Sequence, residues 1–208
     1  MKKLALLLLI TVFTGCSKKL FDQKWVSKEA PEYFKARFET TQGIFDIEAK
    51  REWSPKGVDR LHQLIKSGFY TDIAIYRVVP NFVAQFGIHN TKLLNDNWAK
   101  FKIDDEAVVK SNDEMTISFA RGGRKSRSTQ IVINLKNNKR LDKLDYGGVK
   151  GFPVIAQVTE GEETVNKFYK GYGDKLGMQQ DSINIRGNDF LRRKYPKTDY
   201  IIKAYILK

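Results

Sequence analysis

The sequence predicts a mainly β protein with a single domain, folded as a closed barrel or a sandwich. Many short apolar or alternating segments are separated by turn residues along the chain, as is typical of these folds. The 208 residues show no internal repeat and are enough to bury a sizeable core. Only a few stretches have helical periodicity. The expected strands cover residues 33–39, 44–50, 73–79, 82–88, 115–120, 130–135, 152–158 and 200–207.

The first two strands are predicted to form a half-buried hairpin. Apolar residues alternate with charged or polar ones in residues 33–39 and again in residues 44–50. The sequence TTQG lies between them, and its Gly43 is able to adopt the positive φ that tight turns require.

A well-delimited helix is predicted directly after this hairpin. Ser54 is a favourable N-cap, Pro55 suits the first helical position, and Gly68 is expected to end the helix. Its apolar stripe consists of Val58, Leu61, Leu64 and Ile65.

Two further helices are expected near the C-terminus. An amphipathic helix follows TEGEE, with its apolar face made by Val165, Phe168, Tyr169 and Tyr172. The stretch NDFLRRKYP indicates a short helix that ends at Pro196.

The composition is that of an ordinary globular protein with a basic surface. Hydrophobic residues make up 41% and charged residues 29% of the chain, and the net charge is +13. Such a charge is compatible with anionic partners, but a solvated, soluble surface is the preferred explanation. Cys16 is the sole cysteine, so an intramolecular disulfide is excluded.

The N-terminus resembles a bacterial lipoprotein signal. Lys2 and Lys3 precede an apolar stretch, residues 4–13, which is too short to span a bilayer as a helix. The sequence FTGC then resembles a lipobox, with Phe13 where leucine is usual. The resemblance implies a signal peptide over residues 1–15 and lipid attachment at Cys16. The polar, lysine-rich composition that follows predicts a flexible tether over residues 16–32 before a domain over residues 33–208, although Phe21 and Trp25 could still pack onto that domain. The lipobox resemblance also implies a lipid-anchored protein on the periplasmic side of a bacterial envelope membrane.

The stretch YRVVPNFVAQFG, residues 76–87, places two polar side chains inside an apolar run. Arg77 and Gln85 are too few to make a solvated strand face, and burying an arginine without a partner is expensive. These two residues are therefore better explained by a function than by the core.

The order of these motifs resembles the cyclophilin family of peptidyl-prolyl isomerases over roughly residues 33–207. The resemblance rests on YRVVPNFVAQFG, then SFARGGRKSRSTQIVINL, then GFPVIAQV and a helix. The tail from residue 171 is similar to that of a bacterial subgroup of the family. The resemblance implies a closed eight-stranded antiparallel β-barrel capped by two α-helices, here with a short C-terminal helix and strand.

The resemblance also implies roles for single residues. Arg77 matches the family's catalytic arginine, Phe82 the floor of the proline pocket, and Gln85 the glutamine that holds the arginine. Substrate-binding positions are matched by Val83, Ala120, Arg121, Gly122, Gln130, Val132, Leu141 and Phe152.

An arginine suits this chemistry for a physical reason. Rotation about a peptide bond costs about 18–20 kcal/mol because resonance is broken, and X-Pro bonds interconvert slowly although their two isomers are nearly balanced. A catalyst needs an apolar pocket for the ring and a donor near the prolyl nitrogen, which gains basicity as the amide twists. The guanidinium is always charged and has several N–H donors.

The sequence departs from the family on one wall of the pocket. Val132 replaces a phenylalanine and Leu141 a tryptophan, while Arg121 would add a charge at the groove. We therefore expect retained isomerase activity with a weakened pocket wall, and weak cyclosporin binding.

The remaining polar motifs suggest no second chemistry. His62 and His89 lack metal-ligand spacing, so packing or surface roles are expected, and no metal or cofactor is expected. The basic stretch RGGRKSR, residues 121–127, lacks P-loop spacing and interleaved aromatic residues, so we expect a solvated loop beside the groove rather than a nucleic-acid site. The acidic residues 104–106 are expected to form a solvated turn.

Three function classes follow from these observations. The first is a monomeric isomerase that acts on proline-containing polypeptides of the envelope. The second is a membrane-anchored peptide-binding module or chaperone on the same fold, with weakened catalysis, as the substitutions at Val132 and Leu141 suggest. The third is a basic structural lipoprotein. Retention of Arg77, Phe82 and Gln85 favours the first class.

Overall fold

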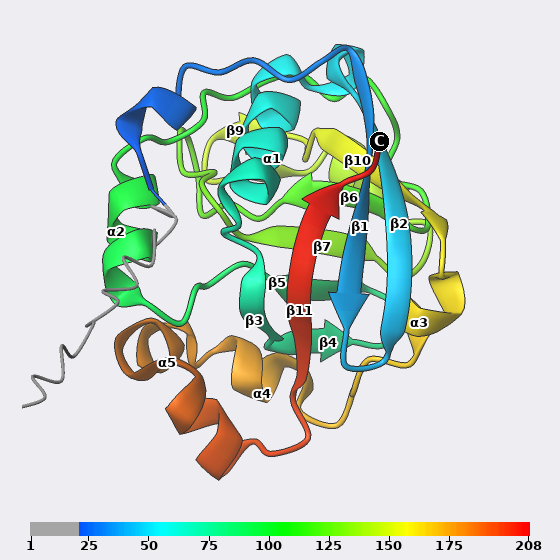
Figure 1. The fold of residues 1–208 in the computed structure, drawn as a ribbon. Helices are drawn as coiled ribbons and strands as arrows, with labels where there is room; N and C mark the ends of the chain where they lie inside the picture. Colours follow the sequence, from blue (N-terminus) through cyan, green and yellow to red (C-terminus); the bar gives the residue numbers. More distant parts are fainter. Residues whose placement is uncertain (1–20) are drawn as a thin grey trace, which may run out of the picture.

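The computed structural model describes residues 21–208, which form an antiparallel β-barrel with helices at its ends and side (Figure 1). The barrel sheet has the strand order β3-β11-β1-β2-β10-β6-β7-β5-β4. The strands are β1 (Tyr33–Thr40), β2 (Gly43–Lys50), β3 (Thr71–Ile75), β4 (Arg77–Val79), β5 (Val83–Phe86), β6 (Thr116–Phe119), β7 (Ile131–Asn134), β10 (Val154–Glu160) and β11 (Asp199–Ile206). A small separate hairpin consists of β8 (Asp145–Tyr146) and β9 (Val149–Lys150).

The barrel is closed by the chain itself between the two edge strands. β3 ends at Ile75 and β4 begins at Arg77, so only Tyr76 separates the two edges of the nine-stranded sheet. Taken as one bent strand, β3 and β4 make the ring eight-stranded. The fold class predicted from the sequence is therefore confirmed.

The barrel core is built by the alternation that the sequence predicted. In β1 the inward side chains of Phe34, Ala36 and Phe38 are buried, and Phe45 of β2 is fully buried opposite Phe38. The rings of Phe38 and Phe45 stack with centroids 4.9 Å apart. Aromatic pairs of this kind add to the apolar area that drives barrel formation.

Helix α1 (Pro55–Ser67) closes one end of the barrel and ends at Gly68 in a left-handed conformation, as predicted. Its N-terminus differs from the prediction. Ser54 is the N-cap residue, but its hydroxyl makes no capping bond and donates instead to Glu106 Oε2, at 2.5 Å. The helix N–H groups of Lys56 and Gly57 donate to the Glu106 carboxylate at 2.8 and 3.2 Å. A carboxylate distant in the sequence therefore caps this helix.

The C-terminal helices differ from the prediction. The single amphipathic helix expected after TEGEE is instead α3 (Glu162–Asn166), followed by a turn and α4 (Gly173–Gly177). The short helix expected around residues 188–196 belongs to the longer α5 (Gln180–Lys194), which is kinked at Gly187 with φ 61°. Because α3 ends at Asn166, the apolar residues Phe168, Tyr169 and Tyr172 lie beyond it and do not extend its face as the sequence suggested.

The C-terminal segment has its own apolar core. Leu176, Ile183, Phe190 and Leu191 are buried together with Ala74, Tyr76 and Ile88. Helix α2 (Lys92–Ala99), which the sequence analysis did not predict, packs against α5. Together these contacts fix α4 beside β4 (Figure 1), the strand that begins at Arg77.

The described part of the predicted tether, residues 21–32, packs on the barrel. Phe21 contacts Trp98 edge-to-face, with ring centroids 5.2 Å apart, and Ala30 is buried. A short 3₁₀ helix covers Gln23–Trp25. Phe21 and Trp25 pack against the core, as the sequence left open, so this part of the predicted tether buries apolar surface. Residues 1–20, including the predicted signal peptide and Cys16, lie outside the described residues.

Between residues 21 and 208, no helix has both the length and the apolar character needed to cross a membrane.

Candidate active site

The strand register places three predicted site residues in one row on the outer face of the barrel. Arg77 of β4 lies opposite Gln85 of β5, and Gln85 lies opposite Val132 of β7. Directly opposed residues of antiparallel strands project to the same face. The neighbouring positions Ala84 and Phe86 are fully buried inside the barrel, so the row faces outward.

A hydrogen-bonded chain connects this row to the next predicted residue. Arg77 Nη1 donates to Gln85 Oε1 at 3.1 Å, and Gln85 Nε2 donates to Gln130 Oε1 at 3.0 Å. The Tyr76 hydroxyl also donates to Gln130 Oε1, at 2.5 Å. Burial raises the pKa of Tyr76 well above its ordinary range, so this hydroxyl stays protonated and remains a donor. The two glutamine amides are thereby held in one orientation.

Phe82 lies beside the guanidinium group, where a pocket floor was predicted. A tight turn brings it there: Phe82 N donates to Val79 O at 3.1 Å, and Asn81 adopts a positive φ of 56°. Asparagine tolerates this conformation better than most residues. The half-buried Phe82 ring lies 5.5 Å from Arg77 Cζ and 5.0 Å from Arg140 Cζ. The cationic group and the apolar surface are therefore adjacent.

A cleft of about 450 Å³ runs beside the row. Ala120 N donates to Gln130 O at 2.9 Å, which fixes the strand end that borders the cleft. The predicted residues Gln85, Ala120, Arg121, Gly122 and Gln130 all contribute to its lining. The opposite side comes from α2 and α5, with Asn95, Gln180 and Asn184. The cleft therefore borders the hydrogen-bonded chain at Gln85 and Gln130.

The remaining predicted pocket residues are largely buried. Val83 is two residues from Gln85 on β5 and is 2% exposed. Val132 and Leu141 are buried as well, Leu141 in the 3₁₀ helix Lys139–Asp142. Phe152 is half-buried, and its N–H donates to Leu141 O at 3.0 Å.

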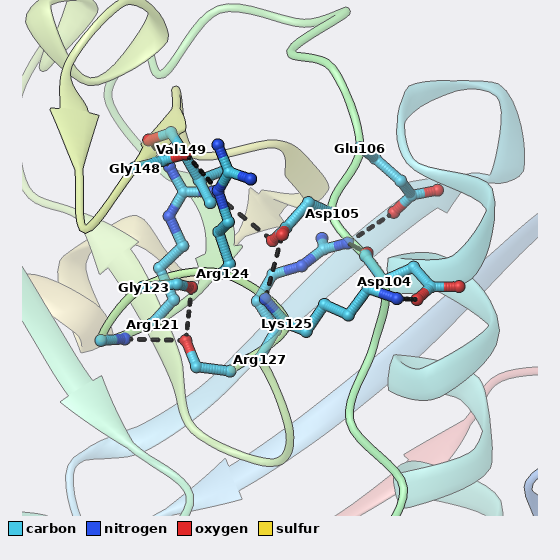
Figure 2. Close-up of polar contacts among 12 residues, drawn as sticks. Asp104, Asp105, Glu106, Arg121, Gly123, Arg124, Lys125, Arg127, Gly148 and Val149 are labelled. Carbon is cyan, nitrogen blue, oxygen red and sulfur yellow. Dashed lines mark hydrogen bonds and ion pairs between the residues drawn. The ribbon is translucent and has the colours of Figure 1, made fainter.

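Arg121 does not add a charge at the groove, contrary to the prediction (Figure 2). Its side chain is 0% exposed, and Nη2 donates to Val149 O at 2.8 Å. The guanidinium Cζ lies 4.5 Å from the Phe152 ring centroid, and Nη1 is 3.9 Å from Asp105 Oδ1. Burial lowers the pKa of Arg121 below its ordinary value. The buried Arg121 side chain therefore packs against the Phe152 ring and supports that side of the site.

The predicted solvated loops are likewise corrected (Figure 2). In the basic loop, Arg127 has a side chain that is 1% exposed and donates from Nη2 to Glu106 Oε2 at 2.9 Å. Lys125 N donates to Asp105 Oδ2 at 3.0 Å. The acidic stretch 104–106 and the basic stretch 121–127 therefore lie together, because their opposite charges compensate one another in a partly buried place. Only Arg124 and Lys125 of the basic side chains in this loop are exposed.

Three residues that contact this network were not predicted from the sequence. Asp174 of α4 accepts from Arg77 Nε at 2.6 Å, across 97 residues of sequence. No local pattern distinguishes this aspartate or Arg140. Tyr76 carried a usable signal, since a tyrosine in a buried run needs a hydrogen-bond partner.

The two histidines lie away from this network. His62 of α1 has its ring 5.1 Å from that of Phe34, and burial lowers the pKa of His62. His89 Nδ1 accepts from Thr91 N at 2.9 Å, and burial lowers its pKa also. Within residues 21–208, no group of three or more His, Cys, Asp or Glu side chains is arranged to hold a metal ion.

Comparisons with known proteins agree with this geometry. The sequence model of the cyclophilin type peptidyl-prolyl cis-trans isomerase/CLD family matches residues 35–188. The chain is 25% identical over 143 residues to a peptidyl-prolyl cis-trans isomerase of Acinetobacter baylyi, which covers 68% of this chain and 75% of that protein. It is 26% identical over 151 residues to peptidyl-prolyl cis-trans isomerase A of Dickeya dadantii, with 68% and 74% covered.

Longer proteins and solved structures also match. The isomerase-like 2 protein of Gibberella zeae is 32% identical over 112 residues, which is 52% of this chain but only 19% of that protein. A cyclophilin type isomerase of Cryptosporidium parvum, solved in the presence of the dipeptide Ala-Pro, has a TM-score of 0.61 at 17% identity and covers 84% of this chain and 99% of its own.

The match at residues 35–188 spans the whole row from Arg77 to Val132 and the cleft residues as far as Asn184. With a barrel of the same fold around that row, this chain belongs to the cyclophilin-type peptidyl-prolyl cis-trans isomerase family.

Proposed function

We propose that this protein is a peptidyl-prolyl cis-trans isomerase in which Arg77 donates to the prolyl nitrogen of the twisted X-Pro bond. The observation that carries the proposal is the placement of Arg77, which is bonded to Gln85 and lies 5.5 Å from the Phe82 ring. A proline ring that packs on Phe82 has its nitrogen within reach of the guanidinium.

Arg77 has donors to spare for this role. A guanidinium carries five N–H groups. Among the described residues, its side-chain hydrogen bonds engage Nε with Asp174 and Nη1 with Gln85. The Nη2 donors face a substrate rather than the protein in this proposal. The side chain is 23% exposed, so the group is accessible yet partly shielded from water. Partial shielding strengthens a hydrogen bond to a developing lone pair.

Catalysis in this scheme needs neither a nucleophile nor a titrating acid. Arg77 must only bind the twisted amide more strongly than the planar one, and each factor of ten in rate requires about 1.36 kcal/mol of such preference. A hydrogen bond to a charged group contributes about 1.5–3 kcal/mol, which corresponds to about 10- to 150-fold in rate.

The test is exchange spectroscopy or a protease-coupled assay on Ala-X-Pro-Phe peptides. Arg77→Ala is expected to lower kcat/KM by about 10- to 150-fold. Arg77→Lys, which keeps the charge but loses the planar fork, is expected to stay well below the wild type. Arg193→Ala removes an exposed arginine of α5 and serves as the matched control. Equal rates for Arg77→Ala and the wild type would refute the mechanism.

The substrates are proposed to be proline-containing polypeptides. The support is the cleft beside the row together with the relative that was solved in the presence of Ala-Pro. The chain also spans only 17–23% of the fungal isomerase-like 2 relatives, so their other activities are not transferred to it.

The location is proposed from the sequence alone. Lys2, Lys3, the apolar residues 4–13 and Cys16 support a lipid anchor that would hold the isomerase on the periplasmic side of an envelope membrane. Cys16→Ser or globomycin treatment is expected to block lipid-dependent processing before residue 16 and thereby to change how the protein associates with membranes. Unchanged processing and membrane association would refute the anchor.

A further inference from the structure

We propose that Asp174 of the C-terminal segment is a positioning residue that orients the catalytic guanidinium of Arg77. This inference rests on the function proposed above. The carboxylate Oδ1 accepts from Arg77 Nε at 2.6 Å, on the opposite side of the guanidinium from the bond between Nη1 and Gln85. Two acceptors from separate elements therefore fix the plane of the group.

The backbone of α4 contributes to the same contact. A Cβ at Gly177 would lie 2.8 Å from Arg77 Cδ and 3.1 Å from Cγ. Glycine is therefore the residue that lets the helix approach the aliphatic stem of the arginine this closely. The stem is held by Gly177 and the head by Asp174, so the side chain loses most of its rotational freedom before a substrate arrives.

Helix α4 is itself held by buried apolar contacts. Leu176, between the two contact residues, is 1% exposed and packs with Tyr76, Ile183 and Leu191. Tyr76 directly precedes Arg77 in the chain and donates to Gln130. The segment that positions Asp174 thus packs on the same backbone that carries Arg77 and its network.

The arrangement orients the arginine without blocking it. Asp174 occupies only Nε, and Gln85 accepts from only one N–H of Nη1. Three of the five N–H groups remain for a substrate. Immobilising a long side chain in advance removes an entropy cost from the transition state, which is the advantage of a preorganised donor.

The ion pair contributes little to folding stability. The Asp174 side chain is 61% exposed, and exposed ion pairs add little to the free energy of unfolding. A loss of activity without a loss of stability is therefore the signature of positioning. A merely structural role for Asp174 would instead lower the stability of the variant and leave the activity of its folded fraction unchanged.

The experiment compares Asp174→Ala, Asp174→Asn and the control Asp189→Ala, an exposed aspartate of α5. Asp174→Ala is expected to lower kcat/KM roughly two- to fivefold, with an unchanged unfolding midpoint. Asp174→Asn keeps an acceptor oxygen at the same place and is expected to retain most of the activity. In an Arg77→Ala background, Asp174→Ala is expected to have no further effect.

An activity-independent readout is the ¹⁵Nε–¹Hε resonance of Arg77, assigned by its absence from the spectrum of Arg77→Lys. In the wild type and in Asp174→Asn, we expect the chemical shift of this N–H to be moved by its hydrogen bond and its hydrogen to exchange slowly with water. In Asp174→Ala, we expect the shift and the exchange rate of an arginine without this hydrogen bond. Activity of Asp174→Ala equal to or above the wild type, or an unchanged resonance, would overturn the inference. An inactive wild type would instead overturn the proposed function, and the resonance would then decide the positioning claim by itself.

Discussion

Replacing Glu106 by glutamine probes the buried charge cluster that supports the 121–127 loop behind the cleft. Glu106 Oε2 accepts from Arg127 Nη2 at 2.9 Å, and Oε1 accepts from Lys56 N at 2.8 Å at the start of α1. The Glu106 and Arg127 side chains are 14% and 1% exposed. One carboxylate therefore neutralises a buried guanidinium and caps a helix.

The loss of stability expected for Glu106→Gln follows from these two roles. Removing one partner of a buried pair costs about 3–5 kcal/mol, because the other charge stays buried. Two further acceptors, Asp104 O and the Ser54 hydroxyl, reach the Arg127 guanidinium and reduce this cost. We expect Glu106→Gln to lower the free energy of unfolding by about 2–3 kcal/mol. For a domain of this size that corresponds to a drop in Tm of about 4–12 °C.

The assay is urea unfolding followed by circular dichroism, together with a thermal scan. Glu114→Gln is the matched control, because Glu114 is exposed, and a change within about 0.5 kcal/mol is expected there. Combining Glu106→Gln with Arg127→Met is expected to recover part of the loss, since the uncompensated charge is then gone. A Tm of Glu106→Gln within about 2 °C of the wild type would refute the reasoning.

Three further outcomes are expected. Gly177→Ala should displace the Arg77 side chain and lower kcat/KM with Asp174 still present, and unchanged kinetics would contradict the close contact of 2.8 Å. Burial alone would raise the pKa of Asp142, but hydrogen bonds from a serine hydroxyl and an asparagine amide hold that pKa below its ordinary value. The stability that ionised Asp142 contributes is therefore present above about pH 4 and is lost as the pH falls through the folded-state pKa. In urea unfolding, Asp142→Asn should be less stable than the wild type near neutral pH, and the difference should disappear in acid. A difference in the free energy of unfolding that does not depend on pH would contradict this. Cyclosporin should bind weakly because Leu141 offers no indole donor, and a nanomolar Kd by calorimetry would disprove it.

The barrel was predictable because its signal is local. Alternation in residues 33–50 indicates which side chains face the core, and the structure buries Phe34, Phe38 and Phe45 accordingly. The stop of α1 at Gly68 was equally readable, since its left-handed conformation favours glycine. The C-terminal helices were not predictable, because four apolar or aromatic residues at helical spacing do not reveal the turn that divides α3 from α4.

The candidate site was predictable in its central row. Arg77, Phe82, Gln85 and Gln130 are adjacent in the structure, as the resemblance implied. The error at Arg121 has a physical cause: a basic side chain in a polar loop gives no local sign that an acidic segment packs against it.

The sequence by itself determined the barrel, its core and the polar pair inside an apolar strand, because each is a periodicity or a misplaced charge within a few neighbouring residues. Only the tertiary structure decided which carboxylates the arginines meet. Asp174 reaches Arg77 from 97 positions away, and Glu106 reaches both Arg127 and the start of α1. Such pairings depend on how separately formed elements pack, and no local pattern encodes that.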